Sequence, residues 1–292
     1  MPENTPNKGE PEAGLYVLAG PIGNLGDISQ RAVEVLKKAS AVAAEDTRRT
    51  VKLLSSLGLR KNIISYREQN HDRIWPKICR VLSEGGVLAL LSDAGAPVIA
   101  DPGARLVRAV REAGFGVWPV PGPSSVITAL TVSGFWAERF VFGGFLPEKS
   151  AGRRALVRQL DTLGLVMVFF ESPHRLAESI GDLVLELGGR REAFLAREMT
   201  KVYEEYLPLS LEKLHESVIE NPRKGEITLV IGPKPKDKSP EIDWAEVLAG
   251  AGSDSRPTAE LAEELWHLTG YSKKEIYNRL LTLRREKEAD KA

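Results

Sequence analysis

Short apolar runs alternate with amphipathic stretches along the first part of the chain. Runs of strand length lie at Leu15–Ala19, Ala41–Ala44, Val87–Ser92 and Val117–Val120. Apolar positions with helical spacing lie between and after them at Ser29–Lys38, Thr47–Leu57, Asp72–Ser83 and Gly103–Ala113. Strands that alternate with helices of this length predict βαβ units and a mostly parallel sheet. The pattern therefore indicates the α/β class.

The pattern changes after Pro123, where strands outnumber helices. Strands are predicted at Arg139–Phe145, Leu165–Phe170, Ala193–Arg197, Tyr203–Pro208 and Ile227–Ile231. Helices are predicted at Arg154–Leu160, Leu176–Leu187 and Leu211–Glu220. Tyr203–Pro208 follows Ala193–Arg197 too closely for a crossover helix, so we expect antiparallel pairs in this sheet.

These patterns divide the chain into four segments. They are a disordered tail (residues 1–12), an N-terminal α/β domain (13–122), a C-terminal α/β domain (123–233) and a linker with a helical tail (234–292). Lys234–Ser239 is rich in lysine and proline, as expected of an extended linker. Thr258–Trp266 and Lys273–Arg285 are predicted as helices around Gly270. Their spacing fits either a helix-turn-helix or a plain helical hairpin.

Composition excludes some classes of site and membrane structure. Of 292 residues, 42% are hydrophobic, which suffices for one large or two moderate domains. Cys79 is the only cysteine, and none of the four histidines pairs at metal-ligand spacing, so no metal site is expected. No apolar run approaches the ~20 residues of a membrane span, and the polar start has no signal core. We therefore expect a cytoplasmic protein with no membrane partner.

Charge leaves nucleic-acid binding open. Lysine plus arginine and aspartate plus glutamate both number 40, so the net charge is zero. Phosphate contacts require a local basic patch rather than a basic chain.

Three small-residue loops follow predicted strands. In Ala19–Asp27 the glycines fall at i, i+3 and i+6, unlike a dinucleotide fingerprint, and Pro21 removes a backbone N–H. Glu45-Asp46 follows the second strand near the ribose-binding distance, so NAD binding stays an alternative. The loop Ser92–Gly103 leaves the clearest buried strand, at the end where α/β sheets bind ligands.

Carboxylates in the second loop suggest ligand contacts. Asp93 and Asp101 can accept hydrogen bonds from an amino acid moiety or from ribose hydroxyls, although Asp101 is also placed to cap the next helix. The third loop, Val120–Val126, contains Ser124 and Ser125 at a helix start, where a hydroxyl serves as a cap or a ligand contact.

Eight short motifs in one order resemble the ribosomal RNA small-subunit methyltransferase I family, from Leu15 to about Gly232. They are Pro21–Asp27, Ala44–Thr50, Ser92–Gly103, Pro121–Ser124, Gly144–Arg153, Phe170–Arg175, Arg197–Lys201 and Lys224–Ile231. Gly20 and Ala96 stand where the family usually has threonine, and Ser125 where it has a small residue such as alanine.

The resemblance implies the tetrapyrrole-methylase fold: two αβα domains with the methyl donor, S-adenosylmethionine, in the cleft between them. A small helical appendage would follow at the C-terminus. Donor contacts are implied for Pro21, Ile22, Asp93, Gly95, Pro97, Ser125, Val126, Phe170 and Thr228. The family's activity is 2'-O-methylation of a cytidine ribose in small-subunit (16S) ribosomal RNA, with the RNA or the 30S subunit as partner, and a homodimer is expected.

Methyl transfer to a ribose oxygen requires positioning and a proton acceptor. Candidate bases beside strand ends are Glu45, Asp46, Glu171 and Glu198, with an ion pair that orients an arginine as the alternative role of each. Candidate phosphate contacts are Arg48, Arg49, Arg153, Arg175 and Lys201. The basic residues of the helical tail would add a second RNA contact.

Two other functions remain open. A tetrapyrrole (precorrin-type) C-methyltransferase on the same fold would bind a small polycarboxylate and would not need the tail. A non-enzymatic RNA-binding protein would not need carboxylates at strand ends. Arg48-Arg49 beside Glu45-Asp46 favours the RNA methyltransferase.

Overall fold

The computed structural model describes residues 11–235, 256–269 and 272–289. The chain divides into two compact units, Met1–Pro233 and Lys234–Ala292, which are described separately. Nearly all of the expected tail at residues 1–12 and most of the expected linker Lys234–Ser239 lie outside the described residues.

The first sheet of the larger unit is wholly parallel. Its strands are β1 (Gly14–Leu18), β2 (Ala41–Ala44), β3 (Ile63–Ser65), β4 (Val87–Leu91) and β5 (Gly116–Val120), in the order β3-β2-β4-β1-β5. All residues of β2 and β4 are buried, as expected for parallel strands covered on both faces.

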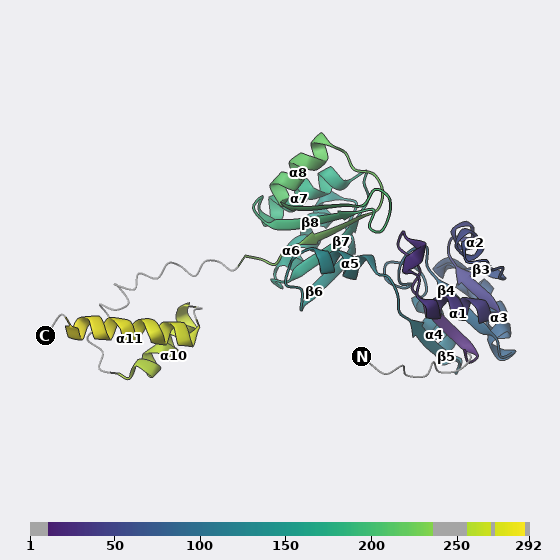
Figure 1. Cartoon of the computed structure of the whole chain (residues 1–292), viewed down its shortest axis with the longest axis horizontal. Helices are drawn as coiled ribbons and strands as arrows, with labels where there is room; N and C mark the ends of the chain where they lie inside the picture. Colours follow the sequence, from purple (N-terminus) through teal and green to yellow (C-terminus); the bar gives the residue numbers. More distant parts are fainter. Residues whose placement is uncertain (1–10, 236–255, 270–271, 290–292) are drawn as a thin grey trace. The chain divides into compact units, whose positions relative to one another are not determined.

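Helices cover both faces of this sheet because side chains alternate along each strand (Figure 1). Leu15 faces α3 (His71–Ser83) and α4 (Ala104–Glu112), whereas Leu18 faces α1 (Gln30–Lys38) and α2 (Thr47–Ser56). Two short 3₁₀ turns, η1 (Leu25–Asp27) and η2 (Glu68–Asn70), lie in the loops. The result is a three-layer αβα domain.

The second sheet mixes parallel and antiparallel pairs, which confirms the prediction for this half. Its strands are β6 (Phe140–Phe145), β7 (Val166–Glu171), β8 (Glu192–Arg197), β9 (Glu205–Ser210) and β10 (Ile227–Ile231), in the order β6-β7-β10-β8-β9. Only β6 and β7 pair in parallel among these neighbours. Pro208 lies in the edge strand β9, where a missing N–H leaves no central ladder bond unmade.

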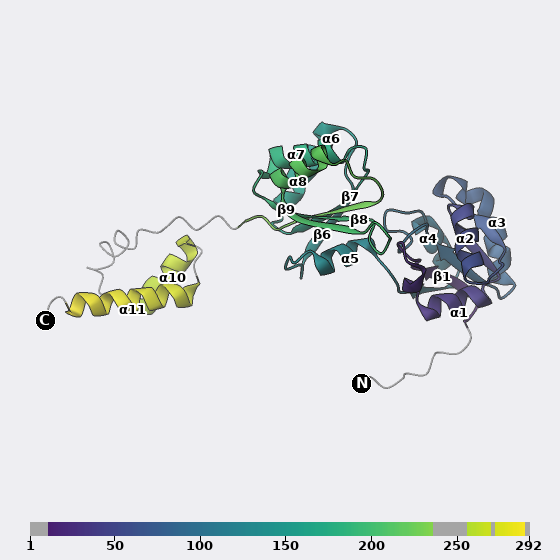
Figure 2. The same cartoon turned by 45° about the horizontal axis from the view of Figure 1, so that its top comes forward.

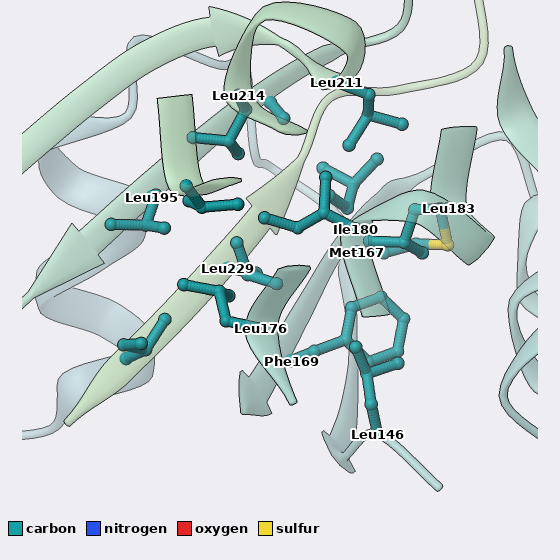
Figure 3. Packing of buried hydrophobic residues seen from close by; sticks show 14 of the residues in the cluster. Leu146, Met167, Phe169, Leu176, Ile180, Leu183, Leu195, Leu211, Leu214 and Leu229 are labelled. Atoms are coloured by element: carbon teal, nitrogen blue, oxygen red, sulfur yellow. The ribbon is translucent and has the colours of Figure 1, made fainter. Parts of the chain in front are cut away.

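The two faces of the second sheet are covered unequally. The helix α5 (Ser125–Val132) packs on one face, and α6 (Ser150–Asp161), α7 (Leu176–Leu187) and α8 (Leu211–Glu220) pack on the other (Figure 2). Figure 3 shows the core on the three-helix side, where Phe169 and Leu229 of the sheet meet Ile180 and Leu214.

Three details differ from the sequence prediction. The strand β3 was not predicted, because only three residues pair and just one of them is buried. The helix α5 was predicted only as a helix start after the Pro121–Ser124 turn. The strand predicted at Tyr203–Pro208 begins two residues later, since Tyr203 is exposed and precedes the ladder.

The smaller unit contains α10 (Thr258–Thr269) and α11 (Lys273–Ala289). They pack through a small buried cluster of Leu261, Ala262, Ile276 and Leu280. Arg284 donates to the Thr258 hydroxyl at 2.9 Å, which ties the two helices together. In the parts of the chain that the structure describes, no helix is long and apolar enough to cross a membrane.

Candidate active site

The loops after β1, β4 and β5 meet because parallel strands bring their carboxyl ends to one edge of the sheet. The Gly20 N–H donates to the Gly95 carbonyl at 2.8 Å, and the Ala19 N–H donates to Val120 at 3.2 Å. The Ser92 hydroxyl also donates to Gly95, at 2.9 Å. The two backbone bonds join the first loop to the second loop and to the end of β5, and the Ser92 hydroxyl fixes the turn of the second loop.

The second sheet presents the start of β10 to the same region. Its antiparallel register sets Thr228 opposite Phe170 of β7 and Ala196 of β8. Ile227 stands opposite Glu171, at the carboxyl end of β7. Thr228 therefore lies beside Phe170 and close to Glu171, although it comes from a distant part of the sequence.

A cavity of about 390 Å³ lies between these two groups of residues. It is lined by Ile22, Arg49, Asp93, Ala94, Gly95, Ala96, Ile99, Ala100, Asp101, Ser124, Ser125, Val126, Phe145, Phe170, Glu171, Ser172, Pro173, Met199, Gly225, Glu226, Ile227 and Thr228. Its volume is in the range typical of small-molecule sites.

Most of the residues expected to contact the donor line this cavity. They are Ile22, Asp93, Gly95, Ser125, Val126, Phe170 and Thr228. Pro21 and Pro97, which were expected with them, are not among the lining residues. Both are neighbours of lining residues in the chain, so they shape the loops rather than the wall.

The residues that line the cavity are compatible with S-adenosylmethionine, the expected donor. Gly95 adopts φ +70°, and a Cβ there would lie 3.3 Å from Ile22, so glycine lets the backbone approach a ligand. Ile22, Val126 and Phe170 form an apolar part of the lining, of a kind that could hold an adenine ring. Asp93 supplies an acceptor for an ammonium or ribose hydroxyl group, and its negative charge suits a cationic sulfonium.

The first loop also contacts the loop after β8. The Asn24 N–H donates to the Thr200 hydroxyl at 3.0 Å. A Cβ at Gly23 would lie 2.5 Å from Cγ of Lys201 and 2.9 Å from the Met199 carbonyl. Only glycine fits there, so Gly23 lets the two halves of the cavity wall close on each other.

Two of the four candidate bases follow β2, outside the cavity lining. Asp46 is the N-cap of α2, and one carboxylate oxygen accepts from the N–H groups of Arg49 and Arg48. These backbone bonds lower the pKa of Asp46, which makes it a weak proton acceptor. Glu45 lines a second cavity instead, one of about 780 Å³.

Glu171 lines the cavity, but both its oxygens are occupied. Its side chain is fully buried and accepts from the Ser172 N–H at 2.6 Å, from Arg175 at 2.8 Å and from the Ser179 hydroxyl. These three donors leave neither oxygen of Glu171 unpaired. The observed role of Glu171 is to hold Arg175 and the start of α7.

Glu198 is held in a similar way beside the cavity. It accepts from Lys201 at 2.8 Å and from the Glu226 N–H at 2.8 Å. Burial raises the pKa of Glu198, but these two hydrogen bonds outweigh it and the net pKa is lowered. Gly225, at φ +97°, makes room for this carboxylate, since a Cβ would lie 2.5 Å from it.

Asp101 differs from the four candidate bases because its surroundings raise its pKa strongly. Burial and then the charges of Asp93 and Glu45 raise the pKa of Asp101 to about 6, against a smaller opposing effect of the Ser92 hydroxyl. The sequence left Asp101 between a helix cap and a ligand contact. The N-cap of α4 is Gly103, so Asp101 is free to face the cavity.

Four of the five candidate RNA contacts differ in how accessible their side chains are to an RNA phosphate. Arg48 is exposed, with no ion pair in the described residues, and Arg49 lies 3.7 Å from Asp93. Arg175 pairs with Glu171, and Lys201 pairs with Glu198 and Glu226. The Arg175 and Lys201 side chains are still 24% and 26% exposed, so part of each remains accessible.

Arg153 was expected to contact RNA, and the structure contradicts this. Its side chain is fully buried and donates to Asp182 at 2.7 Å and to Glu178 at 2.7 Å. It also donates to the carbonyls of Pro147 and Glu148. Arg153 therefore joins α6 to α7, and the motif that contains it is partly structural.

Several lining residues were missed from the sequence. Phe145, Ile99, Met199 and Glu226 come from loops and strand ends with no pattern of their own. Asp101 carried a signal, since it lies in the same small-residue loop as Asp93. In the described residues no group of histidine, cysteine, aspartate and glutamate is arranged to hold a metal ion.

Comparison with known proteins identifies the class of enzyme fold to which the chain belongs. The sequence model of the family described as Tetrapyrrole (Corrin/Porphyrin) Methylases matches residues 14–215. The uroporphyrin-III-C-methyltransferase of Thermus thermophilus has the same fold, with a TM-score of 0.54 at 19% identity over 75% of this chain and 94% of its own. A diphthine synthase superposes with a TM-score of 0.58 at 14% identity, over 75% of this chain and 90% of its own. The cavity is thus the candidate site of a methylase of this fold.

Sequence relatives narrow the class. A protein of Mesorhizobium japonicum named ribosomal RNA small subunit methyltransferase I is 41% identical over 94% of this chain and 93% of its own length. A protein of that name from Escherichia coli O157:H7 is 42% identical over 80% of this chain and 83% of its own. The chain belongs to the ribosomal RNA small subunit methyltransferase I family.

Proposed function

We propose that this protein transfers a methyl group from S-adenosylmethionine to the 2'-oxygen of a cytidine ribose in small-subunit ribosomal RNA. The observation that carries the proposal is the cavity of about 390 Å³, which joins a small-residue loop, an apolar wall and free carboxylate oxygens. The names of the relatives support RNA as the substrate. A ribosomal substrate would place the protein in the cytoplasm.

Each part of the cavity has a task in this reaction. When bound, S-adenosylmethionine supplies a methyl group activated by the positive sulfonium. Ala94, Gly95 and Ala96 allow close backbone contact, and Ile22 and Phe170 exclude water from the reacting atoms. Holding the ribose oxygen in line with the methyl group is the larger part of the catalysis.

The lining argues against a tetrapyrrole substrate. Asp93, Asp101, Glu171 and Glu226 face the cavity. A polycarboxylate would be repelled by Asp93 and Asp101, and Arg49, the cationic side chain in the lining, already lies beside Asp93. A nucleoside ribose is neutral, and its phosphates can remain outside among exposed arginines.

Exposed apolar side chains support a homodimer. Trp136 and Val202 are 85% and 92% exposed, and Tyr203 is 72% exposed. A contiguous exposed apolar patch marks an interaction surface, and we propose that these three side chains contribute to one. We include a second copy of the chain among the proposed partners.

The decisive test maps ribose methylation in ribosomal RNA from cells with and without the protein. One cytidine 2'-O-methyl group is expected to disappear without it and to return when the wild-type chain is restored. Purified protein with donor and either bare RNA or small subunits then identifies the substrate form. An unchanged methylation map would refute the proposal.

A matched pair of glycine variants separates donor binding from folding. Gly95→Ala introduces a Cβ at φ +70°, 3.3 Å from Ile22, and should abolish restoration of the methyl group. Gly85→Ala carries the same left-handed strain at φ +76° but meets no atom within 4 Å. It should restore methylation fully.

A further inference from the structure

The carboxylates that line the cavity differ in how fully they are engaged. Glu171 accepts from Arg175 and two further donors, and Glu226 lies 3.0 Å from Lys201. Asp93 accepts the Asp46 N–H at 3.3 Å and lies 3.7 Å from Arg49. Within the described part of the chain, Asp101 forms no ion pair. Asp101 is thus the lining carboxylate without a cationic partner, and its side-chain hydrogen bond is with the Ser92 hydroxyl.

The backbone fixes where Asp101 lies. Val98 and Ala100 adopt φ 76° and 61°, the left-handed region that a β-branched residue rarely enters. At the other end, the Gly103 N–H donates to Glu68 at 2.7 Å, and a Cβ at Gly103 would lie 2.8 Å from Leu90. The segment is strained on one side and anchored on the other, as expected where a side chain must be held in one position.

We propose that Asp101 is the general base that accepts the 2'-hydroxyl proton of the substrate ribose. This role rests on the function proposed above. The ribose oxygen forms its bond to the methyl carbon while the methyl–sulfur bond breaks and leaves its electron pair on sulfur. The hydroxyl proton passes to a carboxylate oxygen of Asp101 and is later released to water, so one proton is produced for each methyl group transferred.

The charges around Asp101 suit this task. Asp93 and Glu45 lie near it, and together with burial they raise the pKa of Asp101 to about 6. The other charged groups nearby already have partners. Arg49 lies beside Asp93, and Glu68 accepts a hydrogen bond from the Gly103 N–H. Glu171 pairs with Arg175, and Glu226 pairs with Lys201. Asp101 is then mostly ionised at neutral pH, yet it holds a proton more strongly than an ordinary carboxylate, as an efficient base should.

The test compares Asp101→Asn with the wild-type chain in the full-length protein. We expect kcat to fall by roughly 10²–10⁴-fold while the donor Kd, measured by calorimetry, changes less than about threefold. The wild-type rate should fall on the acid side with an apparent pKa of about 6. Glu112→Gln, an exposed carboxylate of α4, is the matched control and should behave as wild type.

A second variant distinguishes a base from a structural residue. Asp93→Asn removes a negative neighbour, so the acid limb of the rate profile should move to lower pH. Carbon NMR of labelled aspartate should show the same shift without any reaction. An unchanged profile, a kcat within threefold of wild type in Asp101→Asn, or a loss confined to donor Kd would overturn the role. If wild type itself methylates no ribosomal RNA, the proposed function fails instead.

The second cavity carries an independent inference about the RNA path. It has a volume of about 780 Å³ and lies at the carboxyl ends of β2 and β3 and the start of α3. Its lining residues are Glu45, Ser65, Arg67, Gln69, Asn70 and Arg73. Arg67 and Arg73 are exposed and have no carboxylate partner among the described residues.

The wall of this hollow is built before any ligand arrives. Asn70 donates to the Ser65 carbonyl at 3.1 Å and accepts the Arg67 N–H at 2.9 Å, so its amide shapes the hollow. The Arg67 and Arg73 guanidinium groups remain free for anions. Glu45 also lines this hollow, and its charge contributes to the raised pKa of Asp101 in the first cavity.

We infer that this hollow binds a phosphodiester of the RNA strand beside the reacting ribose. Binding of a ribosomal RNA fragment by the full chain should lose about 0.7 from its logarithmic salt slope in Arg67→Ala and in Arg73→Ala. Arg80→Ala, an exposed arginine near the other end of α3, should leave the slope unchanged. Equal slopes in all four proteins, or an equal loss in Arg80→Ala, would overturn the inference. No RNA binding by wild type would refute the proposed function itself.

Discussion

Replacing Arg153 with methionine tests whether this arginine stabilises the fold or contacts RNA. The guanidinium is fully buried and donates to Asp182 and Glu178, each at 2.7 Å. Methionine fills much of the same space without the charge. The main consequence is therefore the loss of the cation that partners Asp182.

The two partners contribute unequally to the expected loss. The Asp182 side chain is 10% exposed, whereas that of Glu178 is 64% exposed. Removing one member of a buried pair costs about 3–5 kcal/mol, and an exposed pair contributes about 0–1 kcal/mol. In the variant Asp182 still accepts a hydrogen bond from the Ser150 hydroxyl at 2.9 Å. We therefore expect the lower end of the range for a buried pair, a loss of about 3 kcal/mol in the free energy of unfolding.

Urea unfolding followed by circular dichroism measures this loss, and filter binding measures RNA affinity under native conditions. Arg153→Met/Asp182→Leu should recover much of the stability, since no buried charge is left alone. Arg154→Met is the control and should lose less stability, because its partner Glu186 still forms an ion pair with Arg158. Wild-type stability together with a shallower salt slope in Arg153→Met would refute the structural role.

Four further changes have defined outcomes. Asp93→Asn should raise the donor Kd by tenfold or more, since a charge-assisted hydrogen bond contributes about 1.5–3 kcal/mol; an early-melting variant with normal Kd would make Asp93 structural. Gly225→Ala should lower the melting temperature, because its Cβ meets the Glu198 carboxylate at 2.5 Å; unchanged melting contradicts this. Truncation after Pro233 should preserve donor affinity and slow methylation of small subunits, and equal rates would exclude a docking role for the tail. Trp136→Lys should shift sedimentation from dimer to monomer, whereas an unchanged dimer would place the interface elsewhere.

The fold was largely predictable because its strands are buried and its helices amphipathic. The strands β2 and β4 are wholly apolar, and the loop after β4 is rich in glycine and proline. Such patterns depend only on which residues must be buried. The strand β3 was not predicted, because a three-residue edge strand buries too few side chains to produce a recognisable hydrophobic pattern.

The loops of the cavity were predictable, but the state of each carboxylate was not. Glu171 is the last residue of β7, and Asp101 lies in the loop between β4 and α4. The sequence presented Glu171 as a candidate base and Asp101 as a ligand contact or helix cap, but it did not show which of the two has a cationic partner. The structure gives Glu171 three donors and gives Asp101 two anionic neighbours. The donors of Glu171 lie within eight residues of it, but the fold decides which side chains turn toward its carboxylate. The fold likewise pairs Arg153 with Asp182, 29 residues away in the sequence.

Backbone strain adds a reason to regard the cavity as the functional centre. Among the described residues, left-handed φ values occur at four positions other than glycine: Val98, Ala100, Glu198 and Thr200. The first two lie in the Asp101 segment, and the other two lie in the loop that contacts Gly23. At the remaining left-handed positions the chain has glycine, which adopts this conformation without steric cost. A sequence that avoids strain elsewhere and keeps it in two loops of one cavity must gain something there, because each such residue costs about 1–3 kcal/mol. The gain consistent with the geometry is a fixed position for Asp101 on one side and for the pair of Glu198 and Lys201 on the other, before donor and RNA arrive.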